Sequence, residues 1–308
     1  RVLETETFFK ILDPDAHITD VLEDPNGDLL VLDTGGWFRI GCPTSQVAKP
    51  EVPGAIYRIR KAERSDSRKD PFGLSFDWGN ATAEAIAKKL DDPSFAIQER
   101  ARLELAIQGD PALPELEMIL SDPETFSTTA RRNAVWTLAR MRFTDSPDLI
   151  LAALDDPDFS VRQAACKSIA ATRDWRTIAD NEPEIVRIEI ERNHRIVQKL
   201  ASLLQTGDPT TQRCAAEALG RMGDPAAVGS LLGVVGRETT DRSLEHAVIY
   251  ALIRIGDTNG IRAGLTSENT KRQSAALIAL DQVEGNSLDV LTLLPFLEKE
   301  DAALRETA

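Results

Sequence analysis

The sequence contains few of the residues that most often build metal sites and nucleophilic active sites. It has three histidines and three cysteines, Cys42, Cys166 and Cys214. No two cysteines form a Cys-x-x-Cys pair, so neither a disulfide framework nor a haem-attachment motif is predicted. A P-loop, a dinucleotide fingerprint and a Ser-His-Asp set are missing as well. We therefore predict no catalytic residue and no metal ligand in this chain.

Positive charge and long apolar runs are also scarce. Lys and Arg total 36 against 50 Asp and Glu, which leaves a formal net charge of -14. Such a surface repels phosphate backbones, so we do not expect nucleic acid as a partner. No apolar run approaches the roughly 18 residues that a membrane-spanning helix needs, so no membrane span is predicted.

Neither end of the sequence has the features of a natural terminus. The chain opens on Arg1 without an initiator methionine or a signal peptide, and it closes on Ala308 within a helical pattern. We interpret the chain as a segment of a longer protein, so its targeting is not readable from these residues.

The first segment, residues 1–61, has the pattern of β-strands. Residues 18–22 alternate in polarity, and residues 29–33 and 54–60 predict two further strands. A tight turn is predicted between the first two strands, at Asp24-Pro25-Asn26-Gly27-Asp28. This cluster mimics the start of a calcium loop but lacks the downstream Glu of that motif, so we interpret it as a turn. Strand, turn, strand, loop and strand make up most of one blade of a β-propeller.

The remainder of the chain changes character twice. Residues 62–78 mix charges with Ser, Pro and Gly, which predicts an exposed linker. From residue 79 the pattern becomes helical and repeats. Each small-residue-rich helix has one apolar residue near its end, called its marker residue below: Leu105, Leu138, Ile169, Leu219, Leu252 and Leu280.

The spacing of the marker residues predicts stacked helix pairs. Most steps are roughly 30 residues, as in helical repeat proteins. The step from Ile169 to Leu219 is longer and contains an insertion with one long helix at 184–204. We predict about six helix pairs plus a truncated seventh over residues 79–308.

Aspartate-proline turns separate the predicted helices. Asp91-Asp92-Pro93 recurs as Asp155-Asp156-Pro157, and Asp122-Pro123 is a weaker copy. Asp before Pro favours a helix start, because the carboxylate accepts unpaired N–H groups and Pro suits the first turn. We therefore assign structural roles to Asp92, Asp122 and Asp156.

These turns carry a resemblance to a known family. Together with Val161-Arg162 and with residues 214–228, they resemble HEAT repeats of the bacterial, phycobilisome-lyase-like type. The resemblance covers residues 79–308 and implies an α-α superhelical solenoid that presents binding surfaces. In such repeats an arginine commonly bonds the neighbouring aspartate turn, which implies structural roles for Arg131 and Arg162.

The first segment carries a second resemblance, through residues 17–21, 27–38 and 54–59. It resembles the last propeller blade of large extracytoplasmic proteins of planctomycetes and their relatives, often called membrane-bound dehydrogenase-like. In that family, a propeller similar to sugar and sorbosone dehydrogenases precedes HEAT repeats, and a c-type cytochrome domain often follows. The upstream blades and the Cys-x-x-Cys-His motif are absent from this sequence.

The resemblance implies a periplasmic or otherwise extracytoplasmic location. It implies pyrroloquinoline quinone, calcium or haem c as cofactors of the parent protein, with none in this chain.

Four residues form a candidate channel site in the propeller segment. His17 opens a blade strand and Asp33 ends one, and in propellers such positions can face the central channel. Trp37 and Arg39 follow in a loop that could shape the channel mouth. The alternative is that Asp33 caps a turn, His17 is a surface or packing residue, and Trp37 packs beneath the loop.

We thus predict a mostly α chain with a short N-terminal all-β segment, acting as a non-catalytic protein-interaction or spacer scaffold. Its partner would be a protein or another domain of the same chain. The alternative is a fragment of a quinone- or metal-dependent sugar or alcohol dehydrogenase, with its active site in the missing propeller. The repeat type leaves a lyase or chaperone of tetrapyrrole attachment as a third hypothesis.

Overall fold

A computed structural model describes residues 4–13, 16–35, 53–60, 69–141, 146–172, 183–238, 240–285 and 288–308. The chain divides into two compact units, one of residues 1–80 with 92–100 and the other of residues 81–91 with 101–308. The described residues are mostly helical and include one small antiparallel sheet, as the sequence predicts.

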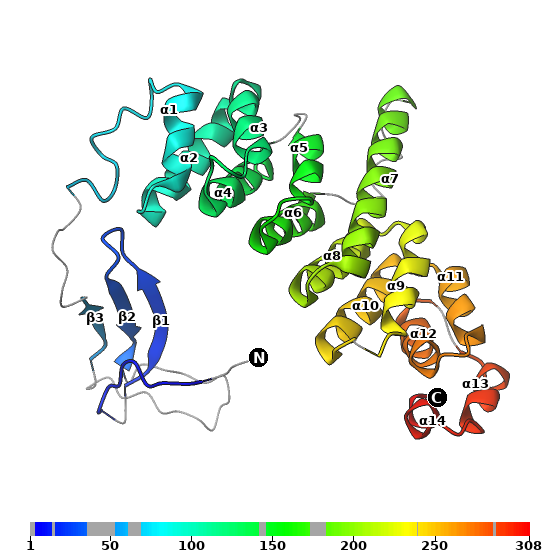
Figure 1. Cartoon of the computed structure of the whole chain (residues 1–308). Helices are drawn as coiled ribbons and strands as arrows, with labels where there is room; N and C mark the ends of the chain where they lie inside the picture. Colours follow the sequence, from blue (N-terminus) through cyan, green and yellow to red (C-terminus); the bar gives the residue numbers. More distant parts are fainter. Residues whose placement is uncertain are drawn as a thin grey trace. The chain divides into compact units, whose positions relative to one another are not determined.

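The sheet lies in the first unit and has three strands in sequential order (Figure 1). Strand β1 spans Ile18–Glu23, β2 spans Leu29–Asp33 and β3 spans Ala55–Ile59. Both pairings are antiparallel, and the register places Val31 opposite Val21 on one side and Tyr57 on the other. The predicted strands are confirmed to within one or two residues at each end. Every residue of β1 is exposed, so the sheet leaves apolar surface uncovered.

The first unit also holds a compact turn in residues 69–80, part of which the sequence assigns to a linker. Trp78 is only 5% exposed, and its indole Nε1 donates to the carbonyl of Gly73 at 2.7 Å. Gly73 has a φ of +65°, a conformation that favours glycine, and a Cβ there would lie 3.1 Å from the Trp78 ring. The Arg100 guanidinium lies 4.8 Å from the centre of the same ring.

Fourteen α-helices occur among the described residues. They are α1 (Ala83–Ala87), α2 (Phe95–Gln108), α3 (Leu113–Ser121), α4 (Thr128–Leu138), α5 (Ser146–Ala153), α6 (Phe159–Thr172), α7 (Pro183–Thr206), α8 (Pro209–Met222), α9 (Val228–Val235), α10 (Arg242–Ile255), α11 (Thr258–Arg262), α12 (Thr270–Gln282), α13 (Val290–Leu297) and α14 (Ala302–Thr307). In chain order these helices make seven pairs, of which α13 and α14 are the last. Helix α7 is the predicted long helix of the fourth pair.

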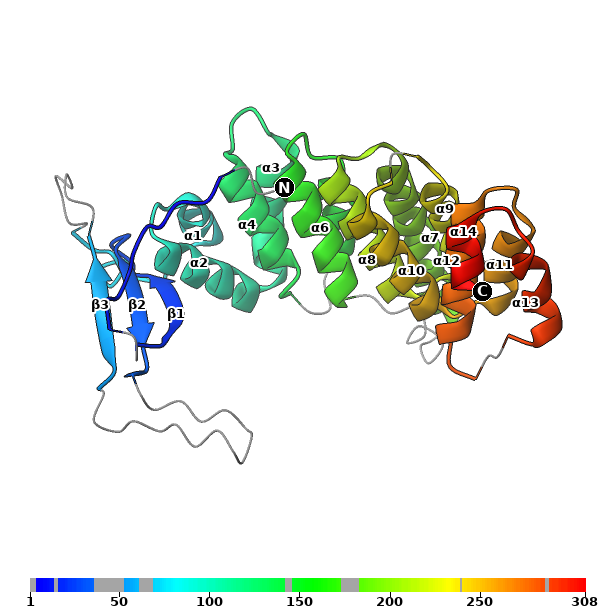
Figure 2. The same cartoon turned by 90° about the horizontal axis from the view of Figure 1, so that it is seen from below.

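From α3 onward the helices of the second unit form two rows. Helices α3, α5, α7, α9 and α11 each contact the next of their series, and so do α4, α6, α8, α10, α12 and α14. We call these the A row and the B row; in Figure 1, α3, α5 and α7 of the A row lie above α4, α6 and α8 of the B row, and Figure 2 shows the B row along its length. The core lies between the rows and includes the marker residues, such as Leu138, Ile169 and Leu219, which are at most 2% exposed.

Small residues set the spacing within the B row. A Cβ on Gly220 of α8 would lie 2.6 Å from the Cα of Ala251 on α10, closer than two carbon atoms can approach. The two backbones are therefore nearly in contact at this point. This explains why the repeated helices are rich in alanine and glycine: larger side chains would separate neighbouring pairs.

Candidate functional site

His17 and Asp33, two members of the predicted channel site, lie together at one end of the sheet. A carboxylate oxygen of Asp33 accepts the backbone N–H groups of His17 and Gly35, both at 2.8 Å. The Nδ1 atom of His17 lies 2.8 Å from the carbonyl oxygen of Gly35. Asp33 is 8% exposed, so its carboxylate serves to join the start of β1 to the end of β2. Trp37 and Arg39 lie outside the described residues.

The cluster at the β1–β2 turn is a hydrogen-bonded turn, as predicted. One oxygen of Asp24 accepts the backbone N–H groups of Asn26 and Asp28, at 2.8 and 3.0 Å. The other oxygen is 2.9 Å from a guanidinium nitrogen of Arg58 on β3. Gly27 has a φ of +81°, which the turn requires. The Asp24 carboxylate is thus occupied by this turn and by the cross-strand ion pair.

The predicted Asp-Pro helix starts are wrong at three positions. Asp92 accepts the N–H of Ser94, Asp122 that of Thr125, and Asp156 that of Asp158. In each case the helix begins further along the chain, so these aspartates shape the turn before the helix instead of its first turn. The rule holds at Asp208, whose carboxylate caps α8 ahead of Pro209. The sequence shows the Asp-Pro pair but not how many turn residues follow it.

Arg131 of α4 connects two successive turns. Its Nε and Nη2 atoms lie 2.7 and 3.1 Å from the two carboxylate oxygens of Asp156, and Nη1 donates to the carbonyls of Pro123 and Phe126. Both partners of the ion pair are almost fully buried, with 5% and 2% of their side chains exposed. Such a planar, two-bond pair orients one helix pair on the next.

Arg162 of α6 repeats the arrangement one helix pair later. Its Nη2 lies 3.2 Å from a carboxylate oxygen of Asp208, and its Nη1 donates to the carbonyls of Asp156 and Pro157. This pair is more exposed, at 19% and 34% of the two side chains. The arginine position thus links three consecutive pairs of the stack.

Asp158, just before α6, keeps its negative charge to a lower pH than an ordinary aspartate. The Ser160 hydroxyl donates to Asp158 at 2.6 Å, and this hydrogen bond is the main reason why the pKa of Asp158 is lowered. Burial, by contrast, raises the pKa of Cys166 to about 12 and also raises that of Cys214. Neither thiol is therefore a nucleophile near neutral pH.

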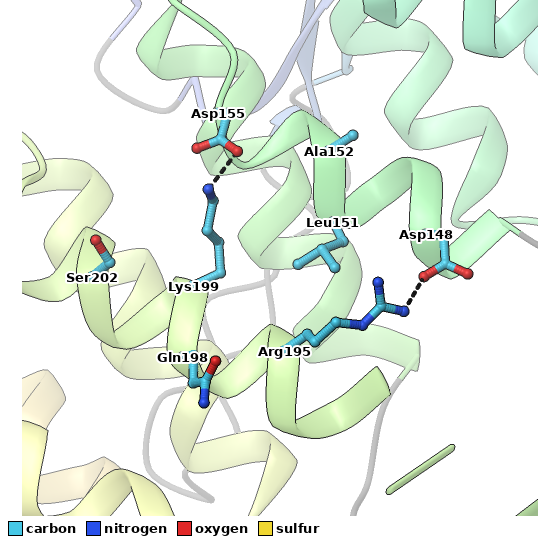
Figure 3. Close-up of a pocket in the computed structure, with 8 residues that line it drawn as sticks. All are labelled: Asp148, Leu151, Ala152, Asp155, Arg195, Gln198, Lys199 and Ser202. Atoms are coloured by element: carbon cyan, nitrogen blue, oxygen red, sulfur yellow. Dashed lines mark hydrogen bonds and ion pairs between the residues drawn. The ribbon is translucent and has the colours of Figure 1, made fainter. Parts of the chain in front are cut away.

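A groove of about 540 Å³ lies between α5 and α7. Arg195 and Lys199 of α7 face Asp148 of α5 and Asp155 just after it (Figure 3). The Arg195–Asp148 distance is 2.9 Å, and Arg192 lies 3.1 Å from the same carboxylate. Both carboxylates are paired with cations from α7. These ion pairs along the groove join the third helix pair to the fourth.

The side of the B row that carries no buried residues is a candidate surface. We define the B face by three residues for each of the five marker residues from Leu138 to Leu280. These three lie six residues before, two residues before and two residues after the marker residue. They are spaced by four, and residues with this spacing share one side of a helix. The B face consists of Arg132, Trp136, Arg140, Gln163, Lys167, Ala171, Arg213, Glu217, Arg221, His246, Tyr250, Arg254, Ser274, Ile278 and Gln282. None of them is buried. The sequence analysis did not identify this face, although its residues stand at fixed distances from the marker residues that the sequence shows.

The described residues contain neither a metal-binding cluster nor a membrane-spanning helix. No group of three or more His, Cys, Asp or Glu side chains could hold a metal ion there. Within the same ranges, no helix combines the length and the apolar character required to cross a bilayer.

Comparison with known proteins gives similarities in sequence and in structure. The family model described as HEAT repeats matches residues 124–180, 181–253 and 197–280. The chain is 26% identical over 178 residues to the "Uncharacterized phycocyanin operon protein Z" of Pseudanabaena tenuis, which covers 58% of this chain and 81% of the relative.

Two solved structures match parts of the chain. The complex of CpcE and CpcF of phycocyanin lyase from Nostoc sp. PCC7120 matches with a TM-score of 0.30 and 18% identity, over 74% of this chain and 94% of that one. A mutant of Kap121p matches with a TM-score of 0.49 and 15% identity, over 73% of this chain and 28% of that one. The family matches together span residues 124–280, which is half of the chain. The chain therefore belongs to the HEAT-repeat family.

Proposed function

We propose that the helical unit is a protein-interaction scaffold and that the B face is its docking surface. The observation that carries this proposal is the exposure of large side chains at one repeated helix position. Tyr250 and Ile278 lie two residues before their marker residues and are 50% and 38% exposed, and Trp136 at the same position of α4 is half-buried. Exposed aromatic and aliphatic groups in register are typical of interaction surfaces.

Site-specific photo-cross-linking tests this proposal. A photoreactive phenylalanine analogue replaces Tyr250 in one variant and the exposed Lys299, which lies outside the B face, in a second variant. After illumination in a cell extract, we expect a discrete protein adduct from position 250 and only background from position 299. Equal labelling at both positions, or none at position 250, would count against the B face as a docking surface.

A second proposal concerns the protein around this chain. We propose that the sheet is the closing blade of a propeller in an extracytoplasmic, dehydrogenase-like protein. The sequential antiparallel order β1-β2-β3 and the uncovered apolar side chains of the sheet, such as Val21 and Ile56, support it. Pyrroloquinoline quinone, calcium or haem c would then belong to the parent protein, which would oxidise a sugar or alcohol.

The full-length parent protein tests the second proposal. Reconstitution with pyrroloquinoline quinone and calcium should yield dye-linked oxidation of sugars or alcohols, and cell fractionation should place the protein outside the cytoplasm. A well-folded parent protein that binds neither quinone, calcium nor carbohydrate would refute it.

The similarity to phycocyanin operon protein Z supports a third candidate, a role in tetrapyrrole attachment. The measurement is the visible absorption spectrum of a bilin mixed with the chain, where binding shifts the absorption band. An unchanged spectrum removes this candidate and leaves the scaffold proposal intact.

A further inference from the structure

The charge of the B face is opposite to that of the whole chain. Six of its residues are basic and one, Glu217, is acidic, whereas the chain has 36 basic and 50 acidic side chains. The basic residues of the B face are Arg132, Arg140, Lys167, Arg213, Arg221 and Arg254. Five of them come from α4, α6, α8 and α10, and Arg140 lies in the turn after α4, so the excess of positive charge is created by the stacking and not by one basic segment.

The packing of the B row brings these side chains onto one surface. Helices α4, α6, α8, α10 and α12 are consecutive neighbours, with backbones close enough at α8 and α10 to exclude even a methyl group. Burial and Glu217 raise the pKa of the Cys214 thiol, and the positive charges of Lys167 on α6 and Arg213 on α8 oppose that rise. Lys167 and Arg213, from adjacent helices, therefore both act electrostatically on the same buried thiol.

Of the three B-face residues for each marker residue, the central one is a large apolar or aromatic residue on three of the five helices. Trp136, Tyr250 and Ile278 stand at the central position of α4, α10 and α12, and Tyr250 and Ile278 are exposed. An aromatic or aliphatic side chain of a partner can pack on these groups, while its carboxylates meet the surrounding guanidinium and ammonium groups.

We propose that the B face binds an acidic protein segment that carries both carboxylate and apolar side chains. This inference rests on the proposed scaffold function and specifies its partner. A long phosphate backbone fits less well, because Asp158, Asp208 and Asp241 border the basic surface at the starts of α6, α8 and α10. A 14-residue helix is about 21 Å long, so a polyanion longer than the basic patch would extend over this acidic border.

Fluorescence polarisation with defined probes tests the proposal. The main probe is a labelled peptide of alternating Glu and Leu with one Phe, and the control probes are the same peptide with Lys for Glu and a labelled oligo-dT. We expect the acidic peptide to bind, and to bind more weakly as salt rises from about 0.05 to 0.5 M, because the surface charges become screened. The Lys peptide should not bind.

Charge-reversal variants locate the binding surface. Lys167→Glu and Arg221→Glu change exposed residues of the B face, and Lys299→Glu makes the same change outside it. Each B-face variant should weaken binding about three- to tenfold, as expected when an exposed attraction becomes a repulsion. Lys299→Glu should bind like the unmodified chain. Circular dichroism melts of all three variants show that the fold is retained.

The outcomes separate this inference from the scaffold proposal. If the peptide binds the B-face variants and the Lys299→Glu variant equally well, or if the Lys peptide binds as tightly, the acidic-partner inference is overturned. Binding of oligo-dT that the same two B-face variants abolish, without peptide binding, overturns it in favour of a nucleic-acid partner. A specific cross-link at position 250 that persists in Lys167→Glu and Arg221→Glu preserves the scaffold proposal alone.

Discussion

The buried pair of Arg131 and Asp156 shows how one side chain orients a helix pair. The guanidinium bonds both carboxylate oxygens of the following turn and two carbonyls of its own turn. Because both side chains are almost fully buried, water cannot replace the guanidinium as a partner of the carboxylate. Removing the arginine leaves a carboxylate in a poorly hydrated place, which costs more than the interaction itself contributes.

Arg131→Ala should therefore destabilise the chain by about 3–5 kcal/mol, measured by urea denaturation followed by circular dichroism. Arg162→Ala provides the comparison, because its pair with Asp208 is more exposed and retains access to water. We expect a clearly smaller loss of unfolding free energy for Arg162→Ala. Equal losses for the two variants would contradict the explanation from burial.

The hydrogen bond from Ser160 to Asp158 predicts a pH effect. Because it lowers the pKa of Asp158 in the folded chain, its stabilisation is present above the unfolded pKa near 4 and is lost as the pH falls through the folded value. Ser160→Ala should thus lower the unfolding free energy at pH 6, and the difference from the unmodified chain should shrink toward pH 2. Ser202→Ala, an exposed serine on α7, is the control and should show no such trend. A difference that stays constant with pH would assign the effect to packing.

At the scale of elements, the distance between helices depends on positions without side chains. Gly220 lies against the backbone of Ala251, and an added methyl group has no space there. By contrast, nothing lies within 4 Å of a Cβ placed on Gly229 of α9. Both glycines lie in helices, but only Gly220 has a neighbouring helix close to it.

Gly220→Ala should destabilise the chain by about 1–3 kcal/mol through overpacking, although alanine favours the helix more than glycine does. Gly229→Ala should instead stabilise it, by about 0.5–1 kcal/mol, because only the backbone effect remains. Thermal melts of the two variants provide the comparison. A gain of stability in both would show that α8 and α10 separate easily.

The bounds of the elements were largely predictable from the sequence. Alternation identified β1, the apolar run after the turn cluster identified β2, and the predicted long helix at 184–204 matches α7 to within two residues at each end. These signals are local, since they depend on residues a few positions apart. The helix starts after Asp92, Asp122 and Asp156 were misplaced, because several turn residues can separate an Asp-Pro pair from its helix.

At the scale of the whole molecule, each helix pair of the second unit is stabilised mainly by its neighbours. Among the residues that the structure describes, the main helix contacts outside each pair run from one pair to the next. Stability in such a stack is a sum of local and nearest-neighbour contributions. A substitution that weakens one interface between helix pairs should therefore destabilise the neighbouring pairs and leave distant pairs unchanged.

Hydrogen–deuterium exchange tests this expectation. In Gly220→Ala, exchange should rise in α8 and α10, which share the altered contact, and stay unchanged in α3 and α4. The same measurement on Gly229→Ala, where no contact is altered, should leave α8 and α10 unchanged. A uniform rise along all helices in Gly220→Ala would mean that the second unit unfolds as one cooperative block.

The sequence by itself determined the repeat, the secondary structure and the types of residue that join successive pairs, because helix and strand periodicities are local properties. Only the tertiary structure decided which residues meet. In it, Arg131 bonds Asp156, and His17 and Asp33 share one hydrogen-bond network at the end of the strands. It also assembled the B face from five helices that are separate in the chain, α4, α6, α8, α10 and α12. The side that a helix turns outward depends on how its neighbours cover the other sides, and no single segment of sequence contains that information.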